Sequence, residues 1–126
     1  MPGVTYDAGA LVAAERNDRR MWALHARLLA EEIIPVVPAP VLAEAWRGGA
    51  RQARLAQFLV QCVVEPMSEE QARAVGVLAG RAAHGDIVDV TVVEGAMRRC
   101  DGIVTSDPDI GRIADALDAK LSIELA

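Results

Sequence analysis

Short apolar runs alternate along this chain with longer segments of helical pattern, and this alternation limits the folds that are open to it. Strands are predicted at residues 3–6, 33–38, 63–67, 101–107 and 120–125. Each successive pair of these runs is separated by at least one predicted helix. Strands that are connected through helices pair in parallel through right-handed crossovers. The pattern therefore predicts an α/β fold with a mainly parallel central sheet, in which residues 120–125 form an edge strand.

The predicted helices have recognisable starts. Asn17 or Asp18 can cap one helix, and Ser68 with Gln71 matches a capping box that opens another. In the segment 86–100 a strand is a real alternative, because its several valines are poor helix formers. The predicted helices span residues 8–15, 19–32, 39–49, 51–61, 69–85, 86–100 and 108–119.

Composition narrows the class of protein. A chain of 126 residues fits one domain, and 52% hydrophobic with only 3% aromatic residues requires a core of Ala, Val, Leu and Ile. The net charge of −5 argues against non-specific nucleic-acid binding over the whole surface, so any such contact must be a local patch. Cys62 and Cys100 are expected to be free, buried thiols.

No segment has the pattern of a secretory signal peptide. No apolar run approaches the roughly 20 residues that are needed to span a bilayer. We therefore expect a soluble, cytoplasmic protein without membrane contact.

Acidic residues follow the predicted strands. Asp7 and Asp107 each end one, so a parallel sheet would place both at the edge where ligands bind. Glu44 and Asp89 lie early in helices and can point into the same crevice. Each acid also has a simpler interpretation, as an N-cap, a turn residue or a solvated helix acid. Four carboxylates in one cleft would repel one another without a cation, and oxygen donors suit Mg²⁺ or Mn²⁺.

Four stretches, taken in order, resemble the PIN-domain ribonucleases, and in particular the VapC-type toxins of bacterial toxin–antitoxin pairs. The spacing from Asp89 to Asp107 is similar to the interval between the third and fourth acids of that family. The resemblance covers essentially the whole chain and implies a single PIN-like domain of three layers over residues 1–126. The stretches are VTYDAGAL, VLAEAWRGG, DIVDVTVVEGAMRRCDGIVTSD and TSDPDIGRIA.

The resemblance implies roles for individual acids. The family's catalytic, metal-binding quartet falls on Asp7, Glu44, Asp89 and Asp107, which would hold one or two Mg²⁺ or Mn²⁺ ions. Glu44 is either a ligand or the base that orients the attacking water. The hydroxyl of Thr105 is expected to bond one of these acids. Two further positions modify the pattern, because Asp86 competes with Asp89 as the third acid, and Ala8 stands where the family often has Thr or Ser.

The resemblance also implies a function and partners. A metal-dependent endoribonuclease would hydrolyse RNA to leave a 5′-phosphate and a 3′-hydroxyl. VapC-type toxins are held inactive by a small antitoxin whose tail crosses the active site, and they commonly form homodimers. The apolar helices near Trp22 and Trp46 are candidate surfaces for these contacts, although tryptophans at helical spacing more often belong to a core.

Arginines are the candidate RNA contacts. Arg47, Arg51 and Arg54 would share one helical face near the acids if the helix continues through the two glycines between them. Arg98 and Arg99 are second candidates, although charges on a helix usually form a solvated face.

Two other functions remain open. The first is a catalytically inactive PIN-like module that binds a protein partner, although a pure scaffold need not keep buried acids. The second is a receiver-type phosphoacceptor, which needs a lysine near its aspartate. Lys120 is the only lysine in the chain, so the second is disfavoured.

Overall fold

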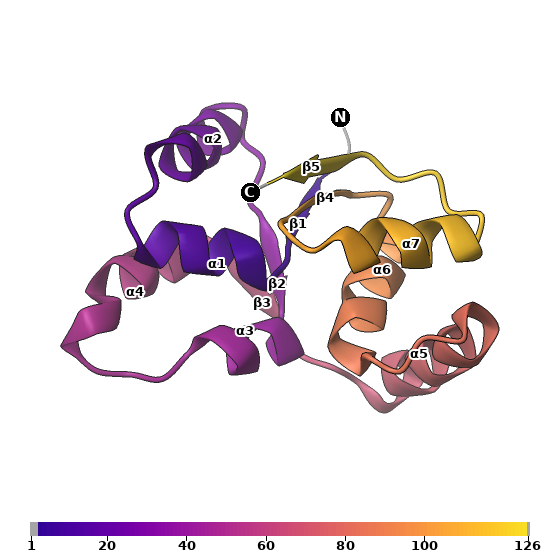
Figure 1. Cartoon of the computed structure of the whole chain (residues 1–126). Coiled ribbons are helices and arrows are strands. Elements are labelled where there is room, and N and C mark those ends of the chain that lie inside the picture. Colours follow the sequence, from indigo (N-terminus) through magenta and orange to yellow (C-terminus); the bar gives the residue numbers. More distant parts are fainter. Residues whose placement is uncertain (1–2, 126) are drawn as a thin grey trace.

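The computed structural model, which describes residues 3–125, contains a five-stranded sheet in which every pairing is parallel (Figure 1). The strand order is β3-β2-β1-β4-β5, so β5 lies at one edge as predicted. The predicted α/β class is confirmed. The strands are β1 (Val4–Tyr6), β2 (Val36–Pro38), β3 (Val63–Glu65), β4 (Gly102–Thr105) and β5 (Ile123–Leu125).

Helices cover both faces of the sheet and produce three layers. Figure 1 shows α1, α2 and α4 on one side, and α5, α6 and α7 on the other. A single 3₁₀ turn, η1 (Ala50–Gln52), precedes α4. The helices are α1 (Ala8–Glu15), α2 (Arg19–Ala30), α3 (Ala39–Ala45), α4 (Ala53–Val60), α5 (Glu69–Ala82), α6 (Ile87–Arg99) and α7 (Pro108–Ala116).

The direction of the chain across the sheet reverses beside β1. The chain steps from β1 outward to β2 and β3, then returns to place β4 on the other side of β1. The Asp7 amide donates to the Val104 carbonyl at 2.9 Å, which extends the β1–β4 pairing to the carboxyl end. In open parallel sheets such a reversal leaves a crevice outside the strand ends, where ligands bind.

The segment with the strand alternative is the helix α6. Val90, Val92 and Val93 are fully buried, because α6 contacts the sheet and also packs against α5 and α7. Burial on several sides stabilises these valines by about 2 kcal/mol each, which exceeds the few tenths of a kcal/mol of helix propensity that they lack. Tertiary packing therefore decides the helix.

The predicted helix 39–49 is wrong in its second half. It ends at Ala45, after which Trp46 has extended backbone angles and Gly48 and Gly49 have φ values of 80° and 89°. Glycine reaches this left-handed region without steric cost, so the pair turns the chain instead of continuing the helix. The arginines beyond this turn, Arg51 and Arg54, therefore do not share a helical face with Arg47.

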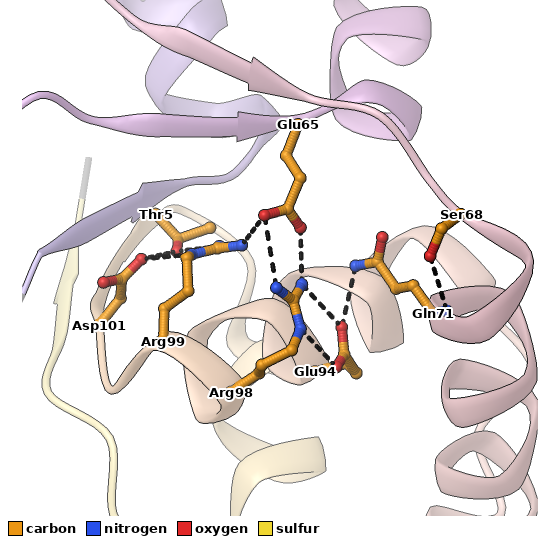
Figure 2. Close-up of polar contacts among 8 residues, drawn as sticks. All are labelled: Thr5, Glu65, Ser68, Gln71, Glu94, Arg98, Arg99 and Asp101. Carbon is orange, nitrogen blue, oxygen red and sulfur yellow. Dashed lines mark hydrogen bonds and ion pairs between the residues drawn. The ribbon is translucent and has the colours of Figure 1, made fainter.

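Two caps confirm the predicted helix starts in part. The Asp18 side chain accepts from the Met21 amide at 2.9 Å, and the Ser68 hydroxyl accepts from the Gln71 amide at 3.0 Å. The capping box is incomplete, however, because the Gln71 side chain donates to Glu94 instead of returning to Ser68 (Figure 2).

Several smaller expectations have mixed outcomes. Cys62 and Cys100 are free as predicted, but neither is fully buried, because Cys62 is half-buried and Cys100 is exposed. Trp22 belongs to the core, where its ring meets Phe58 edge-on, whereas Trp46 keeps 41% of its surface exposed. None of the helices within residues 3–125 has the length and hydropathy that a membrane crossing requires.

Candidate metal centre

An acidic cleft of about 620 Å³ opens where β1 and β4 end. Asp7 directly follows β1, and Asp107 lies two residues after β4. The other acids arrive on helices: Glu44 on α3, and Asp86 and Asp89 at the start of α6. All four acids of the predicted quartet, together with the predicted supporting Asp86, therefore line one cleft.

Three of these acids lie close together. Asp7, Asp89 and Asp107 each offer a carboxylate oxygen, and the three oxygens lie within 4.8 Å of one another. Asp7 is 3% exposed and Asp89 5% exposed. Glu44 lines the same cleft but is exposed and stands outside this close group.

Thr105, at the end of β4, connects two of the acids. Its hydroxyl donates to Asp7 Oδ2 at 2.7 Å and accepts from the Asp107 amide at 2.9 Å. The predicted bond from this hydroxyl to an acid is therefore present. It fixes the orientation of the Asp7 carboxylate, because the threonine is itself fully buried.

Asp107 caps a helix and also belongs to the close group of acids. Its Oδ1 accepts from the Asp109 amide at 2.9 Å and caps α7. A carboxylate has a second oxygen, so capping leaves Asp107 able to take part in the close group.

Asp86 and Asp89 are distinguished by their contacts. Asp86 is the N-cap of α6, and its Oδ1 accepts from the amides of Val88 and Asp89 at 3.0 and 3.1 Å. Asp89, in the first turn, belongs to the close group with Asp7 and Asp107 instead. The geometry therefore gives Asp86 a structural role and leaves the Asp89 carboxylate available to a ligand.

Close packing of α1 against the end of β4 keeps the site narrow. A Cβ atom built on Gly9 would lie 2.8 Å from the Ser106 backbone nitrogen. Such an overlap would push the two segments apart, so only glycine allows the start of α1, and with it Asp7, to lie this close to the loop that carries Asp107.

The electrostatics of the cleft follow from burial and like charge. Burial raises the pKa of Asp89 to about 7, and the negative charge of Asp107 adds to the rise. The pKa of Asp7 is also raised, chiefly by burial, although the hydrogen bond from Thr105 opposes this rise. The pKa of Glu44 is raised by burial and by the neighbouring acids. The charged forms of these carboxylates are therefore under-stabilised by the protein alone.

The donor set fits a divalent cation. Three oxygens that bind one Mg²⁺ at about 2.1 Å must lie closer together than the 4.8 Å that bounds this group, so an ion would draw the three carboxylates inward. Carboxylate oxygens are the donors that Mg²⁺ and Mn²⁺ prefer. Asp7, Asp89 and Asp107 could therefore hold such an ion. His84, Asp89 and Asp109 form a second group whose donor atoms lie equally close.

Solved structures share this architecture. A chain of the VapBC2 complex from Rickettsia felis, crystallised with a DNA fragment from their promoter, superposes with a TM-score of 0.75 at 18% identity, covering 97% of each chain. PAE2754 from Pyrobaculum aerophilum superposes with a TM-score of 0.68 at 16% identity, covering 98% of this chain and 83% of the other. The fold is PIN-like. No protein-family model and no curated protein sequence matches the chain.

The PIN-like fold also brings residues to the cleft that the sequence analysis did not single out. Arg16 lines the cleft, and His84 Nε2 lies 3.6 Å from Asp89 Oδ2. The sequence signals Arg16 only in part: its spacing of four from Ala8 and Val12 places it on one helical face, but the packing of α1 decides that this face lines the cleft. His84 carries no such signal, because the turn before α6 determines its place.

Neither Arg47 nor Arg51 is among the described residues that line the cleft. Arg47 Nη1 donates to the carbonyls of Ala43 and Trp46 at 3.1 and 2.8 Å, and so completes the C-terminal turn of α3. The prediction that Arg47 and Arg51 share one helical face is wrong. Contact of either arginine with RNA stays a prediction.

Arg98 and Arg99 lie away from the cleft, and the interpretation of a solvated helix face is wrong for them. Figure 2 shows both guanidinium groups reaching Glu65 at the end of β3. Arg98 Nη2 lies 2.6 Å from Glu65 Oε1, and Arg99 Nη1 lies 2.7 Å from Glu65 Oε2. Arg98 also pairs with Glu94, and Arg99 with Asp101.

Proposed function

We propose that the protein is a metal-dependent endoribonuclease that acts as the toxin of a toxin–antitoxin pair. The observation that carries the proposal is the convergence of Asp7, Asp89 and Asp107 at the switch point of a PIN-like sheet. Within residues 3–125 these three carboxylates form no ion pair with an arginine or lysine. Buried charge of one sign is expensive, and a site that binds a cation explains it.

In this proposal Mg²⁺ or Mn²⁺ would make a water nucleophilic and neutralise the charge that develops on the leaving oxygen of a phosphodiester. Asp7, Asp89 and Asp107 hold the ion, and Thr105 orients Asp7 through its hydrogen bond. Glu44, on α3, lines the same cleft. Its raised pKa makes it a better proton acceptor, which suits a residue that orients and deprotonates the attacking water.

The proposed partners rest on the resemblance to VapC-type toxins and on the structural likeness to a chain of VapBC2, which is a complex. A small antitoxin would cross the cleft and block access to the acids, and two copies of the chain would form a homodimer. A toxin that acts on cellular RNA works in the cytoplasm. Coexpression with the small protein encoded beside this one tests the pairing. Failure to copurify and to inhibit would contradict it.

The decisive experiment compares the wild type with Asp107→Asn. Asn keeps a side-chain oxygen to cap α7, so the variant removes the charge and leaves the cap. We expect cleavage of mixed-sequence RNA with Mg²⁺ or Mn²⁺ to be lost. The metal-free variant should keep its thermal stability or gain about 1 kcal/mol, because like charges no longer repel. Added Mn²⁺ should raise the melting temperature of the wild type more than that of the variant.

Asp115→Asn is the matched control, because Asp115 is exposed on the same helix. It should cleave RNA and respond to Mn²⁺ as the wild type does. An Asp107→Asn variant that cleaves RNA as the wild type does and responds equally to Mn²⁺ would show that the Asp107 charge is not needed and that the residue is only a cap. A wild type that binds its partner but neither Mn²⁺ nor RNA would favour the inactive interaction module.

A further inference from the structure

One positively charged side chain, that of Arg16, lines the acidic cleft. Of the described residues around it, Arg16 alone is an arginine or lysine, against six acids. Arg16 is the C-cap of α1, the helix whose N-cap is Asp7. A helix rises about 1.5 Å per residue, so these two positions lie about 13 Å apart along α1. Asp18, two residues after Arg16, also lines the cleft, and its Oδ1 accepts from the Met21 amide at the start of α2. Arg16 and the close group of acids therefore lie at opposite ends of α1.

The surface between them is small and uncharged. Ala8, Gly9, Val12 and Ala13 line the cleft together with Arg16. Spacings of four residues place Ala8, Val12 and Arg16 on one face of α1, with Gly9 and Ala13 beside them. The cleft thus runs along α1 as a shallow apolar trough from the acids to the arginine.

The N–H donors of the Arg16 guanidinium are not used by other described residues. Within residues 3–125 its side chain makes no hydrogen bond and no ion pair, whereas Arg47 uses its guanidinium on backbone carbonyls. A guanidinium presents a planar set of N–H donors that matches two phosphate oxygens. The apolar trough in between suits the sugar and base of a nucleotide.

We propose that Arg16 binds a backbone phosphate that flanks the scissile one, so that a single RNA strand lies along α1 from the acids to this arginine. This proposal rests on the proposed nuclease function and adds the path that the RNA strand takes through the cleft. It assigns the RNA contact to a residue at the end of α1, in place of the predicted contacts at Arg47 and Arg51.

The test measures cleavage of a single-stranded RNA of about twelve nucleotides and mixed sequence, with Mg²⁺, over a series of NaCl concentrations. Arg16→Ala should raise KM about fivefold at low salt and leave kcat nearly unchanged, because Arg16 is far from the reacting atoms. The slope of log kcat/KM against log salt concentration should fall by about 0.7, the value for one phosphate contact on a single strand. Arg16→Lys should restore the slope, because it keeps the charge.

Arg20→Ala is the matched control, because Arg20 is exposed at the start of α2 and does not line the cleft. It should match the wild type in KM and in salt slope. Equal KM and slope in Arg16→Ala and the wild type, or an equal loss in Arg20→Ala, would overturn the assignment of Arg16 while cleavage by the wild type keeps the nuclease proposal intact. A wild type that cleaves no RNA with any divalent ion would overturn both.

Discussion

The two ends of α6 lie beside acids whose surroundings differ. At its N-terminal end Asp89 lies among carboxylates, and its one basic contact within residues 3–125 is His84 at 3.6 Å. At its C-terminal end, Glu65 and Asp101 are paired with arginines at 2.6 to 2.9 Å (Figure 2). One end of the helix therefore lies beside acids that its own arginines neutralise, and the other end lies among acids that no arginine or lysine of the described residues neutralises.

The pKa values of the two ends move in opposite directions. Hydrogen bonds from Arg98 hold the pKa of Glu65 below its usual range. Burial raises the pKa of Asp89 to about 7. A paired carboxylate favours the folded state above its ordinary pKa, whereas an unpaired buried one opposes it. The difference supports a stabilising role for the paired acids at the C-terminal end of α6, and it agrees with the cation site that we propose at the N-terminal end.

The sharpest test of the unpaired end compares two neighbouring acids. Asp89→Asn should lower RNA cleavage by about a hundredfold or more, because it removes a proposed metal ligand. Asp86→Asn should keep a measurable fraction of activity, because Asn still accepts the cap bonds from Val88 and Asp89. Initial rates of RNA cleavage with Mg²⁺, measured for both variants, distinguish the two roles. The reverse order would exchange the two roles.

The paired end should affect stability more than activity. Arg99→Ala should lower the free energy of unfolding by about 3 kcal/mol, because it leaves the buried Asp101 and the half-buried Glu65 without this partner. Urea denaturation measures the loss. Arg112→Ala is the control, because it breaks an exposed pair with Asp109 and should cost about 0.5 kcal/mol or less. Equal losses in both variants would remove the contrast between buried and exposed pairs.

The smallest expected effect is on pH dependence. In the unfolded chain Asp89 releases its proton near pH 4, but in the metal-free folded protein only near pH 7. The folded state therefore binds more protons in this window, and its stability falls as pH rises from about 4 to about 7. We expect this site to reduce the free energy of unfolding by about 2–3 kcal/mol between pH 5 and about pH 8 in EDTA.

Asp89→Asn should flatten that part of the pH profile, since its amide does not titrate. The Glu65 side chain contributes in the opposite sense, because its lowered pKa gives stability that is lost as pH falls. If the free energy of unfolding depends on pH in the same way in Asp89→Asn and in the wild type, Asp89 does not destabilise the metal-free protein.

Much of the secondary structure was readable from local pattern. The apolar runs before Asp7 and Asp107 are strands, and Asp18 and Ser68 cap helices as predicted. Such features depend on neighbours within about four residues, which the sequence displays directly. The failure after Ala45 was local as well, because the conformations of Gly48 and Gly49 end α3 where apolar spacing alone suggested that it continues.

The sequence by itself determined the alternation of strands and helices, and therefore that Asp7 and Asp107 would meet at one edge of a parallel sheet. Only the tertiary structure decided which charges have partners. Arg98 and Arg99 resemble a solvated helix face in the sequence, yet they meet Glu65 from a strand more than thirty residues earlier. Charge pairing depends on atoms a few ångströms apart in space, and separation along the chain does not encode that distance. The same reason applies to Arg16, whose place in the cleft becomes visible only when α1 packs beside the ends of β1 and β4.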